Sequence, residues 1–256
     1  MKILIDNSVL QFAIAFKGKW QSSSIKKWGG SIIETGGIRS VLQSSPIRKL
    51  PPQDGYIAAL TKKLLNGEAE VYTTDALNYE KWYHPAGRFR GASYGDISLL
   101  SKITSKQIRT LEGFSFSLPS DSIAEKLRAY INESQEADFL AIKNVLPRKS
   151  SQDAWHLYCV KKYNLDVFLT MDASLIGQIR SIADQNIRDS LMQIVRTPEE
   201  LCANFGIRAL SDDEIICFAR NELGADPFFL PTPIVRKPAM VDKIREFFKE
   251  LVHKRA

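Results

Sequence analysis

The sequence predicts an α/β fold, a three-layer arrangement in which helices flank a mostly parallel central sheet. Short apolar runs with strand character alternate along the chain with segments of helical spacing. This alternation is typical of folds in which each strand is followed by a crossover helix. The 256 residues, of which 44% are hydrophobic and 25% charged, are enough for one large domain with additions.

The first part of the chain contains two strand–helix units with an insertion between them. Residues 18–55 are rich in Gly, Ser and Pro and hold paired glycines among β-branched residues, which predicts a hairpin or irregular insertion. The second predicted strand follows a helix that stops at Asn66 and Gly67. The expected strands are 2–6 and 68–74, and the expected helices are 8–16, 56–67 and 75–83.

The second part is predicted to be mainly helical. Two of its helices carry a hydroxyl residue at the N-cap, Glu three residues later and Gly at the stop. Residues 1–207 are assigned to the main domain and 208–256 to a helical C-terminal extension. The expected helices are 97–110, 120–133, 150–164, 196–206, 211–224 and 240–254, with a strand over 165–172 and a Pro-rich link over 226–238.

Acidic residues from distant parts of the chain are predicted to meet at one edge of the sheet. Asp6 ends the first strand, and Asp172 ends the strand over 165–172. Asp153 lies in the first turn of the helix before that strand. Strand ends and helix starts share the carboxyl edge of a parallel sheet, where ligands bind. Asp75 and Glu80 follow the second strand, Asp75 at the edge and Glu80 further down its helix with a longer side chain.

Clustered carboxylates need a counter-charge to stay ionised, and a hard divalent cation such as Mg²⁺ is the usual one. A metal held in this way supports in-line displacement at phosphorus, so the cluster predicts phosphodiester hydrolysis. Taken one at a time, each acid has a simpler interpretation as a helix cap, a first-turn acid or a solvent-facing residue.

The net charge of +6 is concentrated near the N-terminus. Residues 17–63 hold nine Lys or Arg against two acids, which favours a polyanionic partner such as nucleic acid. Arg88 and Arg90, in a Gly-rich loop with aromatic neighbours, are predicted to contact single-stranded RNA. The alternatives are a solvated basic face, and packing of Trp20 and Trp28 onto the core.

Three segments resemble the PIN-domain family of metal-dependent ribonucleases, over about residues 1–207. They are ILIDNSVL, DAWHLYCVKKYNLDVFLTMD and RTPEELCANFGI. The resemblance implies a parallel sheet flanked by helices and cleavage of single-stranded or structured RNA with Mg²⁺ or Mn²⁺. Asp6, Asp153 and Asp172 match three of the family's four acids, and Glu80 fits the fourth, with Asp75 as the alternative. Thr170 matches a Ser/Thr position near the metal, and Ser8 follows the first acid; both are assigned to substrate binding.

The sequence therefore predicts a metal-dependent endoribonuclease, and the alternative is a catalytically silent PIN-like module that binds RNA or protein. Three segments exceed the compact family pattern and put a toxin role in doubt. They are the insertion at 18–55, the loop at 84–118 and the tail from 208. A cytoplasmic location without a membrane span is expected, because no twenty-residue apolar run, signal peptide or CxxC pair is visible. The amphipathic helix over 240–254 is a candidate homodimer or protein contact.

Overall fold

The computed structural model describes residues 1–28, 31–42, 53–80, 96–114, 123–147, 150–224 and 234–236. Its centre is a five-stranded sheet in the order β5-β4-β1-β6-β7, and every neighbouring pair in it is parallel. This confirms the α/β class and the parallel sheet. The strands are β1 (Lys2–Ile5), β4 (Glu70–Thr74), β5 (Ser105–Ile108), β6 (Val167–Leu169) and β7 (Val195–Arg196).

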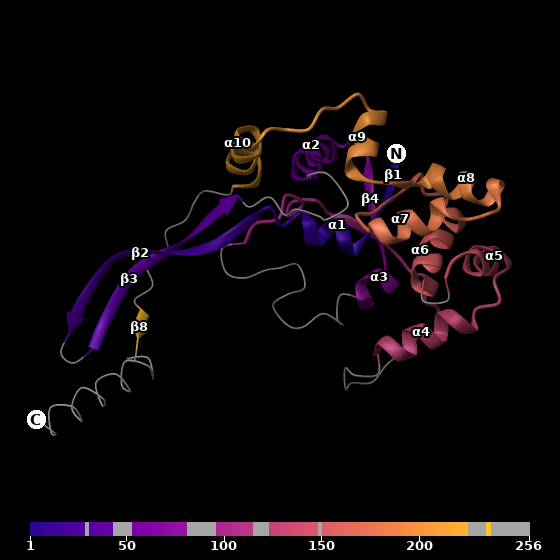
Figure 1. Cartoon of the computed structure of the whole chain (residues 1–256), viewed down its shortest axis with the longest axis horizontal. Helices are drawn as coiled ribbons and strands as arrows, with labels where there is room; N and C mark the ends of the chain where they lie inside the picture. Colours follow the sequence, from indigo (N-terminus) through magenta and orange to yellow (C-terminus); the bar gives the residue numbers. More distant parts are fainter. Residues whose placement is uncertain are drawn as a thin grey trace, which may run out of the picture.

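Helices cover both faces of the sheet because side chains along each strand alternate between the faces. Leu4 and Phe168 enter the core on one face, while Ile3 and Leu169 enter the core on the other. The first face packs against α3 (Asp75–Glu80), α4 (Ile123–Glu133), α5 (Ala137–Val145), α6 (Ser151–Lys162), α7 (Ala173–Arg180) and α8 (Gln185–Ile194). The second packs against α1 (Asn7–Phe12), α2 (Asp54–Leu65), α9 (Pro198–Asn204) and α10 (Asp212–Leu223) (Figure 1).

The predicted capping signals at two helices are confirmed. Thr197 and Ser211 each accept from the backbone N–H three residues later, and the Glu at that position bonds back to the N-cap N–H. α10 ends at Gly224, whose φ of 66° is the left-handed conformation that glycine adopts without strain. α10 buries Phe218 in the same core as α2, and the domain division at residue 207 stays a prediction.

The predicted insertion is a long antiparallel hairpin, β2 (Phe16–Trp28) with β3 (Ser31–Leu42). Figure 1 shows it extending away from the sheet and its helices. The helix predicted over 8–16 is shorter than expected, because the chain enters β2 at Phe16. A short strand, β8 (Ile234–Arg236), pairs with β3 in the segment predicted to be only a Pro-rich link.

The prediction of a polar helix over 97–110 was wrong. Residues 105–108 form the edge strand β5, paired with β4, and the chain before it forms turns. Three of the four residues of β5 are exposed, so the segment lacks the apolar alternation that reveals a strand.

Arg88, Arg90 and the helix predicted over 240–254 lie outside the described residues. None of the helices described here is long and apolar enough to cross a membrane.

Candidate functional site

The candidate site lies where the order of the parallel sheet changes direction. After β1, the next strands of the sheet along the chain, β4 and β5, lie on one side of β1, and the later strands β6 and β7 lie on its other side. Ligands in open parallel sheets bind beyond the carboxyl ends of the strands at such a switch point. Asp6 follows β1 at this point, and residues 170–172 follow β6 beside it. The backbone N–H of Asp6 donates to the carbonyl oxygen of Leu169 at 3.0 Å.

Two hydroxyl groups hold the carboxylate of Asp6. Thr170 Oγ1 donates to Asp6 Oδ2 at 2.7 Å, and Ser8 Oγ donates to the same oxygen. Each hydroxyl also accepts a backbone N–H, Ser8 from Met171 at 2.9 Å and Thr170 from Asp172 at 3.1 Å. These bonds tie the segments after β1 and β6 together around Asp6. Thr170 is fully buried, so we revise its assignment from substrate binding to positioning Asp6, whereas substrate contact by Ser8 stays a prediction.

The two remaining predicted aspartates begin helices at the same edge. Asp172 is the N-cap of α7, where its Oδ1 accepts from the N–H groups of Ser174 and Leu175. Asp153 lies in the first turn of α6 and is partly buried. Burial, and then the charges of Asp172, Asp6 and Glu80, raise the pKa of Asp153 to about 6 against the opposing charge of His156.

The fourth acid, Glu80, is held by a histidine that the sequence analysis did not assign. His156 Nε2 lies 2.7 Å from Glu80 Oε1, and Asn7 Nδ2 donates to Glu80 Oε2 at 3.1 Å. The His156 side chain is 3% exposed and stacks on Phe168, and its Nδ1 has no hydrogen-bond partner in the described part of the chain. One signal was present in the sequence: His156 is three residues after Asp153, so both lie on the same side of α6.

We call Asp6, Glu80, Asp153 and Asp172 the acid cluster. Burial raises the pKa of Asp6, although the hydrogen bonds from Ser8 and Thr170 oppose the shift. Burial alone would lower the pKa of His156, but the charge and hydrogen bond of Glu80 and the charges of Asp6 and Asp153 raise it overall. The charges of the other three predicted acids and of His156 therefore all act on Asp153, which couples the titration of these groups.

Asp75, the alternative fourth acid, points elsewhere. Its carboxylate accepts from the N–H groups of Thr110 (2.9 Å), Leu111 (3.1 Å) and Ala76 (3.0 Å), and from the Thr110 hydroxyl. These bonds join the start of α3 to the chain leaving β5. Asp75 is therefore a structural acid, and Glu80 is the member of the acid cluster.

Replacing Asp75 with Ala is expected to lower the free energy of unfolding by about 2–4 kcal/mol, because the N–H groups of Thr110 and Leu111 lose their acceptor. Urea denaturation monitored by circular dichroism measures this change. Any nuclease activity per folded molecule should stay within a few-fold of wild type, in contrast to Glu80→Gln. Loss of activity at unchanged stability would show that Asp75 belongs to the site instead.

The donor atoms of the acid cluster suit a hard cation, but they do not form a closed coordination sphere. Carboxylate oxygens are the ligands that Mg²⁺ and Mn²⁺ prefer, and Mg²⁺ keeps several waters when only one or two carboxylates bind it directly. In the part of the chain that the structure describes, no group of three or more His, Cys, Asp or Glu side chains is arranged to hold a metal ion. Hydrogen bonds to Asn7 and His156 and the cap at α7 engage some of these oxygens.

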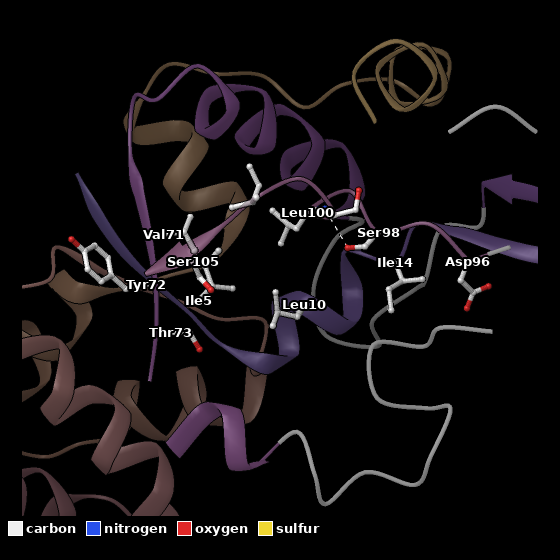
Figure 2. Close-up of a pocket in the computed structure, with 12 residues that line it drawn as sticks. Ile5, Leu10, Ile14, Val71, Tyr72, Thr73, Asp96, Ser98, Leu100 and Ser105 are labelled. Carbon is white, nitrogen blue, oxygen red and sulfur yellow. Dashed lines mark hydrogen bonds between the residues drawn. The ribbon is translucent and has the colours of Figure 1, made fainter. Parts of the chain in front are cut away.

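A separate pocket of about 340 Å³ lies beside α1, β4 and β5 (Figure 2). Aliphatic side chains line half of it, among them Leu10, Ile14 and Leu100, and most of the other lining residues are polar. The only carboxylate among its lining residues is Asp96, which accepts from Gly18 N–H and pairs with Lys17 at the base of the hairpin. No member of the acid cluster lines this pocket, so its chemistry is distinct from that of the cluster.

The fold and the site define an α/β protein with an acid cluster at the switch point of a five-stranded parallel sheet. The chain matches no family model, no curated protein and no solved structure. The resemblance to PIN domains therefore stays a prediction, carried by the residues of the chain itself.

Proposed function

We propose that the protein is a metal-dependent endoribonuclease of PIN-like type. The observation that carries this proposal is the convergence of four carboxylates from four separate segments at the switch point of the sheet. Such convergence places acidic charge where an open parallel sheet binds its ligands, and the raised pKa of Asp153 is characteristic of functional sites.

Asp6, Glu80, Asp153 and Asp172 would hold Mg²⁺ or Mn²⁺. When bound, the cation supplies neutralising charge for a phosphate and acidifies water. Ser8 and Thr170 fix the orientation of Asp6 through their hydroxyl groups. His156 and Asn7 fix Glu80. Asp172 keeps its position because the N–H groups of the first turn of α7 hold one of its oxygens.

The test is incubation of labelled RNA and DNA pools with the wild-type protein and Asp6→Ala, in EDTA, Mg²⁺ or Mn²⁺. We expect wild type to cleave RNA internally when a divalent ion is present and Asp6→Ala to be inactive. Cleavage by the two proteins at equal rates, or cleavage in EDTA, would contradict the proposal. The DNA pool shows whether the activity is restricted to RNA.

The alternative is a catalytically silent PIN-like module that binds RNA or protein. The observation in its favour is that no group of carboxylates in the described residues is arranged to hold a metal. Calorimetry with Mn²⁺ separates the two functions, because the nuclease needs a saturable metal site that Asp6→Ala weakens. Absence of metal binding in the wild-type protein would favour the silent module.

A further inference from the structure

The hairpin of β2 and β3 carries an unusual distribution of charge. Between Phe16 and Leu42, the described exposed cations are Lys19, Lys26, Lys27 and Arg39. None of them pairs with an acidic side chain of the described residues. Lys17, at the base, is held 3.5 Å from Asp96. The hairpin therefore offers cationic groups that no acidic side chain of the described residues neutralises.

The strand register places three of these cations with Lys17 on one face. Lys19 lies directly opposite Arg39, and Lys17 lies two residues before Lys19 on the same face. Between Ser22 and Ser24 a β-bulge shifts the register by one residue, which brings Lys26 to this face as well. We call the set Lys17, Lys19, Lys26 and Arg39 the basic face of the hairpin.

The pairing of Lys19 with Arg39 distinguishes the basic face from ordinary protection of a sheet edge. Lysines on edge strands commonly prevent aggregation, and this accounts for scattered charges on a hairpin. Like charges directly opposite each other in an antiparallel pair, however, destabilise the sheet. A bound polyanion removes this repulsion, so the cross-strand pair is the feature that favours a ligand-binding surface.

We propose that the basic face is a docking surface for the phosphate backbone of double-helical nucleic acid. From Lys17 to Lys26 it spans about 30 Å at roughly 3.3 Å per residue, close to the ~34 Å of one duplex turn. The major groove of B-form DNA admits a two-stranded ribbon, and the minor groove of A-form RNA is wide and shallow.

A single strand is the less suitable ligand for this face. Proteins that bind single strands stack the bases on aromatic side chains. Trp20 faces the other way: it lies opposite Ile38, and its indole covers Gly36, where a Cβ would lie only 2.8 Å from the ring. From Lys17 to Lys26 no position that the register puts on the basic face is aromatic, and Trp28, paired with Ser31, follows only at the end of β2. The hairpin leaves the body after α1, ten residues beyond Asp6.

The experiment measures binding without cleavage, by fluorescence anisotropy in EDTA over a series of salt concentrations. The probes are 20-base-pair RNA and DNA duplexes, the matching single strands and phosphatidylserine vesicles. The triple variant Lys19→Gln/Lys26→Gln/Arg39→Gln should bind a duplex at least about tenfold more weakly than wild type, and its salt slope should fall by about 3. The matched control is Lys126→Gln/Arg128→Gln/Lys161→Gln, which removes exposed charges of the same type from α4 and α6 and should bind like wild type.

The proposal is overturned if the triple variant and the control lose equal affinity, or if wild type prefers single strands or vesicles to both duplexes. Thermal melting checks that the triple variant folds, and its midpoint should be unchanged or higher, since the repulsion between Lys19 and Arg39 is gone. A role of the basic face in RNA cleavage rests on the proposed function, but binding of a duplex by this face does not. A protein that binds duplexes through the basic face and never cleaves them would overturn the nuclease proposal alone.

Discussion

Replacing Asp153 with Asn is expected to give a protein that is more stable and inactive. The pKa of Asp153 is raised to about 6 from an ordinary value of 3.8, so at pH 7.5 the folded protein holds a carboxylate that would be better solvated when unfolded. A rise in pKa from 3.8 to about 6 corresponds to about 3 kcal/mol of unfolding free energy, and the partial exposure of the side chain reduces the expected gain to about 2 kcal/mol. Asparagine keeps the shape of the side chain and removes the charge.

The raised pKa of Asp153 also determines whether the stability of the protein rises or falls with pH. A carboxyl group whose pKa is raised by folding contributes stability that is fully present below pH 3.8 and is lost as the pH rises through about 6. The pKa of His156 is also raised, and its contribution likewise disappears as the pH rises above its ordinary value of 6.5. Titration of Asp153 and His156, and of Asp6, whose pKa is also raised, should therefore make metal-free wild type less stable as the pH rises from 4 to 7.5. Asp153→Asn should lose the part of this slope that Asp153 contributes.

Urea denaturation in EDTA at several pH values measures this slope. Asp138→Asn is the matched control, because Asp138 is an exposed acid in the first turn of α5 and lies outside the acid cluster. It should leave the pH dependence unchanged and slightly weaken its helix. Mn²⁺ should stabilise wild type and not Asp153→Asn, because only a ligand that binds the folded state raises its stability. RNA cleavage by Asp153→Asn should fall at least about 100-fold; a less stable or fully active variant would contradict the interpretation.

Some parts of the site could be predicted because their signals are local in the sequence. Asp6 stands directly after β1, Asp172 stands three residues after the end of β6, and Asp153 stands in the first turn of a helix, so strand and helix boundaries alone place them at one edge of the sheet. The capping boxes at α9 and α10 are similarly local, since the cap residue and its Glu are three positions apart.

The remaining parts depend on contacts between distant segments. β5 and β8 are short strands whose existence depends on pairing with β4 and β3, and their own residues carry little pattern. Asp75 and Glu80 belong to one short helix, and only their partners, Thr110 for one and His156 for the other, distinguish a structural acid from a site acid. A sequence pattern records the type of a side chain but not the partner that it meets after folding.

His156 is expected to position Glu80, and the variants His156→Leu and His156→Gln test this separately. Leu fills the buried space but removes the donor to Glu80 Oε1, whereas the Nε2 amide of Gln reaches about as far as the imidazole Nε2 and restores a donor. Hydrogen-bond partners of metal-binding carboxylates typically contribute 10–100-fold to metal affinity or activity. We therefore expect His156→Leu to bind Mn²⁺ about 10–100-fold more weakly than wild type, and His156→Gln to stay within a few-fold of it.

Calorimetric titration with Mn²⁺, well below the melting temperature of every variant, separates positioning from packing. Both substitutions disturb the stacking on Phe168 and the buried site of the imidazole, so both should lower the melting temperature. Only the loss of the donor should lower metal affinity, because the carboxylate of Glu80 is then held by Asn7 alone. Equal Mn²⁺ affinity in His156→Leu and wild type would restrict His156 to packing, and equal weakening in both variants would mean that a donor at this position is not sufficient to orient Glu80.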